Sequence, residues 1–345
     1  MVNVYYVCMV FCTVFGQTDT FYFARSPFCD MIRDRNHLFL QKKKERKKKE
    51  AYGMKVLTYM QGGHKAVGIL KKNGQEVVPV NYLGCGLVNM TEFIASMTED
   101  KMQKLEKNAE LMDGIPMEEV RLLSPIVHPK QDVICLGINY YAHAEEAARF
   151  HDEAFGGERP QPIYFSKRVN RAVGDGEPID GHFDIVDSLD YEAELAVIIG
   201  KDAKNVAEAD AFDYVFGYTV LNDISARNLQ TSHKQWYFGK SLDDFTPIGP
   251  WIVTKNEFEN PPALSIRSYV NGELRQDSNT SLMINGVAKV ISQLSQGMTL
   301  QAGTIIAMGT PAGVGMGFEP PKFLKAGDVV TCEIEGIGKL TNEIK

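Results

Sequence analysis

The sequence lacks several features that would each indicate a particular class of protein. Its six cysteines include no C-x-x-C pair, which disfavours a disulfide framework or a zinc site and favours the reducing cytoplasm as the compartment. No apolar stretch reaches the ~18 residues that a membrane span needs. Asp and Glu (44) outnumber Lys and Arg (37), so no basic excess suggests nucleic acid as a partner. No internal repeat is evident.

The first 53 residues differ in character from the rest. The apolar run Val4–Phe15 is similar to the core of a signal peptide, but it has neither a basic segment before it nor a clear cleavage site after it. The charge block Lys42–Glu50 is typical of a solvated tail or, alternatively, of a short nucleic-acid-binding arm. Its Lys, Arg and Glu residues can all be encoded by codons that contain only purines. A purine-rich run just before a Met resembles a ribosome-binding region that has been translated. We therefore expect residues 1–53 to be disordered or a non-native extension, with Met54 as the natural start. Finding them in the mass of the native protein would contradict this.

From Met54 onward, the pattern predicts a small region followed by a large one. With 345 residues and 44% hydrophobic content, the chain can bury one large core and a smaller one. Short apolar runs with Gly-containing turns predict a β-meander, and apolar residues at helical spacing over 90–112 predict one or two helices after it. We expect a small N-terminal domain over 54–125 and a proline-containing linker near 124–131.

The remainder, 132–345, is expected to form the larger domain. It is rich in strand-forming residues, with only short helical candidates such as Asn139–Phe150 and Ser225–Ser232. Its strands are irregularly spaced and separated by Gly/Pro turns, which favours a mixed β-roll or sandwich over a doubly wound α/β sheet. The predicted fold class is therefore mixed α/β and predominantly β.

Three carboxylates suggest a metal site. Glu192 and Glu194 stand two apart at the start of an apolar strand, so both project from the same face. Their repulsion would be relieved by a hard cation such as Mg²⁺ or Mn²⁺, which prefers carboxylate oxygens. Asp223 follows another apolar strand, and Arg227 and Gln230 would share its face if a helix began there. The alternatives are a solvated sheet face for the Glu pair and a helix N-cap for Asp223.

A histidine and a glutamate suggest a general base. His143 and Glu146 stand at i, i+3 on a predicted helix, where the carboxylate could fix the imidazole tautomer and raise its basicity. An ordinary surface ion pair is the alternative. The Gly-containing stretch 307–315 lacks the G-K-[ST] ending of a phosphate loop, so nucleotide binding is disfavoured.

Six segments in order carry a resemblance to a known family. They are "GINYYAHAEE", "DYEAELAVIIGK", "NDISARNLQ", "FGKSLDDFTPIGP", "VNGELRQDSNTSLMI" and "GTPAGVG". Together they resemble the fumarylacetoacetate hydrolase family, especially its acylpyruvase-type and 2-hydroxyhepta-2,4-diene-1,7-dioate isomerase-type branch. The resemblance covers nearly all of 132–345, and 54–125 looks like the small N-terminal domain of many bacterial members. "SLDDFTPIGP" and the missing proline after "YFSK" depart from the family's usual pattern.

The resemblance implies a fold, a cofactor and a set of site residues. It implies a mixed β-roll, a homodimer, and Mg²⁺ or Mn²⁺ held by Glu192, Glu194 and Asp223. It implies that His143 and Glu146 are a catalytic pair, on a segment that closes as a lid, and that Lys240 contacts the substrate in the same catalytic group. The remaining substrate-binding residues that it implies are Arg227, Gln230, Thr310 and Lys167.

The function expected from these residues is hydrolysis of a C–C bond in an acylpyruvate-type 2-oxo acid. The metal would stabilise the departing pyruvate enolate as a Lewis acid, and His143 would activate a water molecule. Lys240 and Arg227 would offset the negative charge that three carboxylates leave on a dication. The same chemistry also serves a diene-dioate isomerase or an oxaloacetate decarboxylase, and a non-catalytic metal-binding protein is a further alternative. The sequence of the lid segment, 149–162, does not define the substrate.

Overall fold

The computed structural model describes residues 53–151 and 161–345, all within one of the two compact units into which the chain divides, 51–345. The predicted extension, apart from its last residue, and the centre of the predicted lid (152–160) lie outside the described residues. No helix in the described part is both long and apolar enough to cross a membrane.

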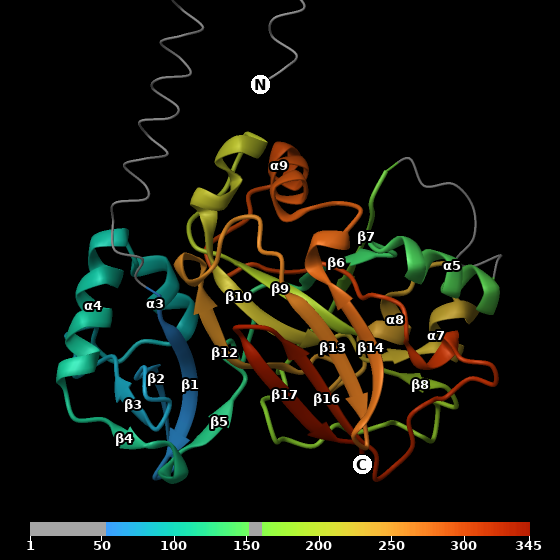
Figure 1. The fold of residues 1–345 in the computed structure, drawn as a ribbon, viewed down its shortest axis with the longest axis horizontal. Helices are drawn as coiled ribbons and strands as arrows, with labels where there is room; N and C mark the ends of the chain where they lie inside the picture. Colours follow the sequence, from blue (N-terminus) through green and yellow to red (C-terminus); the bar gives the residue numbers. More distant parts are fainter. Residues whose placement is uncertain (1–52, 152–160) are drawn as a thin grey trace, which may run out of the picture. The chain divides into compact units, whose positions relative to one another are not determined.

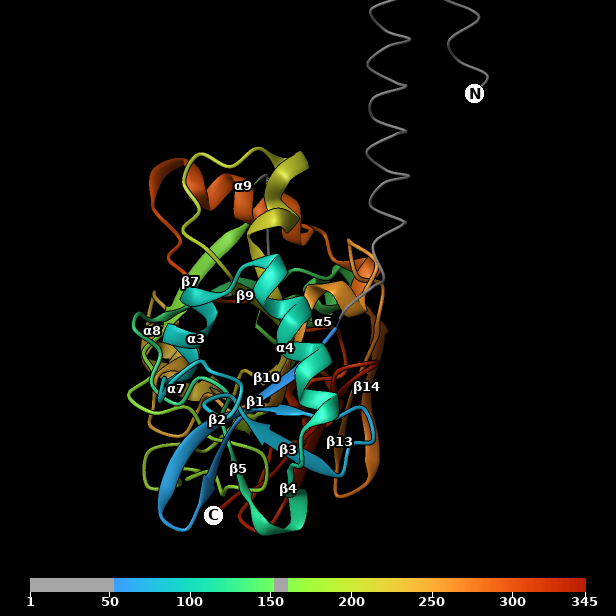
Figure 2. The same ribbon diagram turned by 90° about the vertical axis from the view of Figure 1, so that its left-hand side faces the viewer.

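The N-terminal region is a small set of strands with two helices (Figure 1). Strands β1 and β2 form a hairpin whose turn, Gly62–Gly63, has positive φ angles of 55° and 81° that favour glycine. Helix α3 begins with a capping box between Asn89 and Glu92. The elements are β1 (Lys55–Gln61), β2 (His64–Leu70), β3 (Glu76–Pro79), α3 (Met90–Ser96), α4 (Glu99–Leu111), β4 (Ile115–Pro116), η1 (Met117–Glu119) and β5 (Arg121–Leu123). Figure 2 shows α3 and α4 beside these strands.

A single large sheet runs through the described region. Its strand order is β4-β3-β2-β1-β12-β10-β9-β15-β6-β7, with β5 paired to β1. Most pairs are antiparallel, but β15 and β6 are parallel. The strands after β5 are β6 (Val133–Gly137), β7 (Ile163–Lys167), β9 (Ala193–Ile199), β10 (Val215–Asn222), β12 (Ile248–Thr254) and β15 (Ile305–Ala307). Because β1 pairs with β12, the strands before residue 125 and those after 132 share one sheet.

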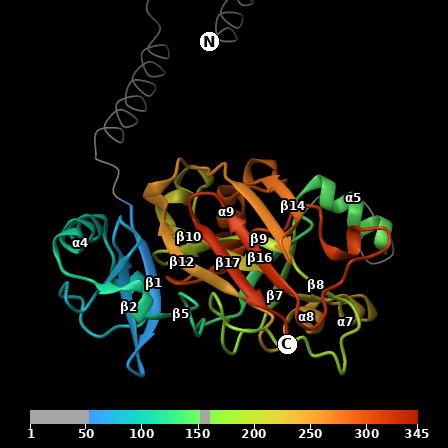
Figure 3. The same ribbon diagram turned by 60° about the horizontal axis from the view of Figure 1, so that its bottom comes forward.

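A second sheet packs against the middle of the large one (Figure 3). It has four strands, β13 (Ser265–Val270), β14 (Glu273–Asn279), β16 (Val329–Ile334) and β17 (Gly338–Glu343), and a separate pair is formed by β8 (Leu189–Asp190) and β11 (Ser225–Ala226). The remaining elements are α5 (Tyr141–Phe150), η2 (Glu208–Tyr214), α7 (Arg227–Ser232), α8 (Tyr237–Lys240), η3 (Lys255–Glu257), η4 (Thr280–Leu282), α9 (Val287–Gly297) and η5 (Gly315–Gly317). Strands β9 and β10 are buried along their whole length, since both faces of the large sheet are covered there.

The predicted fold class, mixed α/β and rich in strands with an N-terminal β region, is confirmed. Two predicted helices start two residues later than expected. The helix expected over Asn139–Phe150 begins at Tyr141. The helix expected over Ser225–Ser232 begins only at Arg227, because Ser225 and Ala226 pair with β8. Asp223 is therefore not on this helix; it lies between β10 and β11.

Candidate metal centre and catalytic pocket

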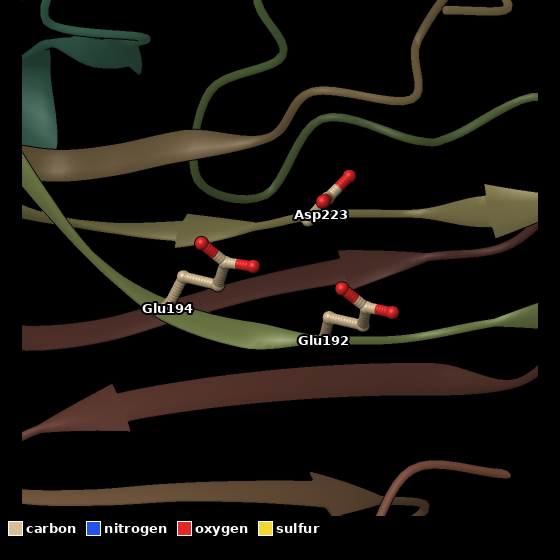
Figure 4. A group of neighbouring side chains, drawn as sticks. All are labelled: Glu192, Glu194 and Asp223. Carbon is tan, nitrogen blue, oxygen red and sulfur yellow. The ribbon is translucent and has the colours of Figure 1, made fainter. Parts of the chain in front are cut away.

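Three carboxylates meet where β9 begins and β10 ends. Glu192 directly precedes β9, Glu194 is its second residue, and Asp223 directly follows β10. The antiparallel register of the two strands brings Asn222 opposite Ala193, so the three side chains become neighbours. One oxygen from each carboxylate lies within 4.8 Å of the others, and all three side chains are buried. Figure 4 shows the three carboxylates pointing to the same side of the two strands.

The three carboxylates differ in how their charge is balanced. Burial would raise the pKa of Glu192, but the nearby Lys240 and Arg227 lower it to about 2. Burial raises the pKa of Glu194 well above its usual range, and the like charges of Asp223 and Glu192 raise it further. Glu194 accepts a hydrogen bond from the backbone N–H of Gly309 (2.7 Å), but it forms no ion pair with any described residue. A buried carboxylate beside two others and without a cationic partner is suited to a bound cation.

Three buried cations surround the carboxylates. Lys240 Nζ lies between Glu192 (2.9 Å) and Asp223 (2.8 Å), and Lys167 Nζ donates to Asp223 (2.5 Å) and to a backbone carbonyl. Burial lowers the pKa of Lys167, although Asp223 opposes this. Arg227 Nη2 lies 2.7 Å from Glu192 Oε1. The carboxylate oxygens of Glu192, Glu194 and Asp223, together with the lack of an ion-pair partner for Glu194 among the described residues, fit a hard divalent cation such as Mg²⁺ or Mn²⁺.

The predicted histidine–glutamate pair is formed on helix α5. His143 Nδ1 lies 3.1 Å from Glu146 Oε2, and both side chains are buried. The backbone N–H of Gly313 donates to both carboxylate oxygens of Glu146 (3.0 and 3.2 Å). A Cβ at Gly317 would overlap the Glu146 carboxylate, so only glycine at this position leaves room for Glu146. An ionised Glu146 can only accept, so Nδ1 donates to it and Nε2 is left as a possible base.

One pocket gathers most of the predicted site residues. Those that line it are His143, Glu192, Arg227, Gln230, Lys240 and Thr310. Thr310 Oγ1 donates to the carbonyl of Ala193, beside the carboxylates. The predicted site residues that do not line it are Glu146, Lys167, Glu194 and Asp223. Lys167 contacts Asp223, and its predicted contact with substrate stays a prediction. The catalytic and substrate-binding roles of the other residues likewise stay predictions.

Sequence reasoning missed three residues that shape the site. Asp190 is fully buried and accepts hydrogen bonds from Arg227 and from the loop that holds Glu146. Gln276, on β14, donates to Thr310 Oγ1 (2.7 Å) and accepts from the N–H of Ala193. Trp236 lines the pocket and packs edge-on against Phe165. Asp190 had a signal, since it stands two residues before Glu192, and Gln276 had only its place in the segment "VNGELRQDSNTSLMI" that carries the resemblance. Trp236 had none, because only tertiary folding brings it to the site.

Comparisons with known proteins identify the family of the chain. Residues 132–345 match the C-terminal domain of fumarylacetoacetate (FAA) hydrolase. The chain is 42% identical to oxaloacetate tautomerase YisK of Bacillus subtilis (strain 168) over 270 residues, which is 78% of this chain and 88% of that protein.

Two solved structures extend the similarity to the fold. The fumarylacetoacetate hydrolase of the psychrophilic Exiguobacterium antarcticum is 39% identical, with a TM-score of 0.73 over 85% of this chain and 99% of that chain. Maleylpyruvate hydrolase of Sphingobium sp. SYK-6, solved with manganese(II) and pyruvate, is 28% identical, with a TM-score of 0.67 over 84% of this chain and 98% of that chain. The chain therefore belongs to the fumarylacetoacetate hydrolase family.

Proposed function

We propose that the protein is a Mg²⁺- or Mn²⁺-dependent hydrolase that cleaves the C–C bond of acylpyruvate-type 2-oxo acids. The observation that carries the proposal is the buried cluster of Glu192, Glu194 and Asp223, in which Glu194 has no ion-pair partner among the described residues. Glu192 also lines the pocket that holds His143. Neither a solvated sheet face nor a surface ion pair has this arrangement, because all four side chains are buried.

The charge of the site supports an anionic substrate. Five buried carboxylates (Glu146, Asp190, Glu192, Glu194 and Asp223) meet three buried cations (Lys167, Arg227 and Lys240), which leaves a formal charge of −2 when all are ionised and His143 is neutral. A bound dication would bring this to zero, so that Arg227 and Lys240, which line the pocket, can attract a 2-oxo carboxylate. When bound, such a cation would supply Lewis-acid stabilisation of negative charge on the 2-oxo oxygen.

The side chains of the pocket can perform the proton transfer that hydrolysis requires. His143 Nε2 would take a proton from a water molecule as its oxygen attacks the distal carbonyl, with the resulting imidazolium stabilised by Glu146. Breaking the C–C bond then gives a carboxylic acid and the enolate of pyruvate, which takes up a proton to form pyruvate. Arg227 and Thr310, which line the pocket, are suited to hold the substrate carboxylate.

A second candidate is keto–enol tautomerisation of oxaloacetate. It is favoured by the 42% identity to a protein named oxaloacetate tautomerase. It needs a base that moves one proton between carbon and oxygen and no attacking water, so the same His143 could perform it. Decarboxylation of oxaloacetate and isomerisation of a diene-dioate share the enolate and stay as alternatives.

The test uses the full chain, stripped of metal and then given Mg²⁺ or Mn²⁺. Acetylpyruvate, fumarylpyruvate and oxaloacetate are followed by loss of enol absorbance and by coupled detection of pyruvate. We expect metal-dependent pyruvate release from an acylpyruvate, abolished in Glu194→Gln and unchanged in the exposed control Glu118→Gln.

The other outcomes decide among the alternatives. Loss of oxaloacetate enol absorbance without pyruvate would replace the hydrolase with the tautomerase, and pyruvate from oxaloacetate alone would replace it with a decarboxylase. Metal binding without turnover of any of these acids would contradict the hydrolase, and a diene-dioate would then be assayed for isomerisation.

A further inference from the structure

Asp190 is a buried carboxylate that connects two parts of the site. It lies on β8, is 0% exposed, and accepts from the N–H groups of Tyr191, Gly315 and Met316 as well as from the Arg227 side chain. We propose that Asp190 is a positioning residue that sets both the orientation of Arg227 against the metal ligand Glu192 and the position of the loop that holds Glu146. This inference rests on the proposed function.

The first connection runs to the carboxylate cluster. Arg227 Nε donates to Asp190 Oδ2 (2.9 Å), and its Nη2 lies 2.9 Å from the same oxygen. That Nη2 also lies 2.7 Å from Glu192 Oε1, while Nη1 donates to Gln230 (3.0 Å). The charge of Arg227 is thus shared between two carboxylates. If a neutral side chain replaced Asp190, more of the Arg227 charge would act on Glu192, where it would compete with a bound cation.

The second connection runs to the histidine. Asp190 Oδ1 accepts from the N–H of Gly315 (2.6 Å), and Oδ2 accepts from the N–H of Met316 (3.1 Å). Two residues earlier in this loop, Gly313 N–H donates to Glu146, which contacts His143. A chain of hydrogen bonds and loop backbone therefore leads from Asp190 to the proposed base. A Cβ at Gly315 would lie 2.6 Å from Asp190 Oδ1, so the loop approaches this carboxylate as closely as a bare backbone allows.

Only a carboxylate can serve both connections at this position. Every neighbour of the Asp190 side chain named above is a donor, and an ionised carboxylate has acceptor sites on both oxygens. The amide of Asp190→Asn has the same size, but its NH₂ would face either Arg227 or a backbone N–H. The substitution therefore breaks one connection while it preserves the volume of the side chain.

The first measurement is Mn²⁺ affinity without substrate, by electron paramagnetic resonance. We expect Asp190→Asn to weaken Mn²⁺ binding by about 10-fold, as loss of a residue that supports a metal ligand does. In the Arg227→Met background, Asp190→Asn should change the Mn²⁺ affinity by less than about 2-fold, because the Arg227 charge that would act on Glu192 is absent from that variant. The exposed Asp184→Asn is the matched control.

The second measurement is turnover of whichever 2-oxo acid proves to be a substrate in the assay of the proposed function. We expect Asp190→Asn to lower kcat by about 10- to 100-fold with a smaller change in KM. In the Glu146→Gln background, the loss should be much smaller than in the wild type, since the connection to His143 is already weakened. A merely structural role would lower the folded fraction and give independent, additive effects in both cycles.

Each outcome bears on the proposal. Additive effects in both cycles, or unchanged Mn²⁺ affinity and kcat in Asp190→Asn, would overturn it. If Asp190→Asn fails to fold, Gly315→Ala presses on the same contact from the loop, and an unchanged kcat in that variant would overturn the connection to His143. If the wild type turns over none of the 2-oxo acids, the proposed function fails, while the Mn²⁺ cycle still tests the connection to Arg227.

Discussion

Among the described residues, His143 has one side-chain hydrogen-bond partner, Glu146, which the backbone N–H of Gly313 holds in place. We expect His143→Asn to lower kcat for the hydrolysed acylpyruvate by ~10²–10⁴-fold, because a general base contributes about that much. Its Mn²⁺ affinity should stay within about 2-fold of the wild type, since His143 is not among the three carboxylates proposed to hold the cation. Steady-state kinetics and electron paramagnetic resonance on the same samples measure the two quantities.

The control for this prediction is His64→Asn on strand β2, an exposed histidine far along the chain from the pocket. Turnover that persists in His143→Asn at the wild-type rate would remove His143 from the mechanism. A variant that loses both turnover and Mn²⁺ binding would show that the substitution disturbs the whole site rather than the base.

Sequence patterns predicted the carboxylates of the site better than they predicted the residues that hold the site in position, such as Asp190. Glu192, Glu194 and Asp223 stood out because charges at strand ends are conspicuous among apolar neighbours, and the structure brings them together. Asp190 stands in the same stretch, but its role depends on a loop more than 120 residues away in sequence. Contacts over such distances form by packing and leave no local period, so the support of the site could not be predicted.

Among the elements, the long connection between β7 and β8 (168–188) contains a carboxylate, Glu177, that ties it to β5. Glu177 pairs with Arg121 of β5 (2.7 Å) and Arg171 (2.6 Å), and accepts from the N–H of Gly174 (2.8 Å). Burial would raise the pKa of Glu177, but these three donors lower it below its usual range. This connection borders the site, because it joins β7, which ends at Lys167, to β8, which ends at Asp190.

We therefore expect Glu177→Gln to lower the free energy of unfolding at pH 7 by about 1–2 kcal/mol, the contribution of hydrogen bonds to a charged group. A carboxylate with a lowered pKa in the folded state stabilises fully above its unfolded pKa, and the contribution is lost as the pH falls through the folded pKa. The difference between wild type and variant should thus be largest at neutral pH and shrink in acid.

Urea unfolding from pH 7 down to pH 3 measures this difference, with the exposed Glu208→Gln as control. A stability difference that stays constant over this range would mean that the charge of Glu177 is not what stabilises the connection.

The elements themselves were predicted with uneven success. The meander, the two helices after it and helix α5 follow from local periodicity, which needs no tertiary information. The start of α7 did not, because Ser225 and Ala226 take their conformation from pairing with β8 across the fold. A two-residue strand has too few residues for any pattern, so the partner alone determines it.

At the scale of the whole molecule, the described region is joined by one sheet and by a shared core. Backbone pairs Lys55–Val253 and Val56–Ile252 connect β1 to β12, and Met54 N–H donates to Thr254 Oγ1 (2.9 Å). Phe93 of α3 packs edge-on against Phe216 of β10. The expected division into a small domain over 54–125 and a larger one over 132–345 remains a prediction, and this sheet provides its test.

We expect a fragment of residues 132–345 to be poorly soluble or to unfold without a cooperative transition. Removing β1 would expose one edge of β12 and the apolar surface that α3 covers. Thermal unfolding followed by near-ultraviolet circular dichroism, compared with the intact chain, tests this. Addition of the 54–125 segment as a separate chain is the control. A fragment that unfolds cooperatively by itself and binds Mn²⁺ would establish two independent domains.

The pairing of β1 with β12 also limits how this protein can exchange parts with its relatives. The family match begins at residue 132, between β5 and β6. In space that boundary cuts through a sheet, because the two paired strands lie on opposite sides of it. A chimera joined there inherits two strand edges from different parents, and their registers and apolar faces must match. Exchange of the segments before and after residue 132 should therefore succeed mainly between parents in which β1 and β12 pair in the same register with matching apolar faces. Similar catalytic residues alone would not be enough.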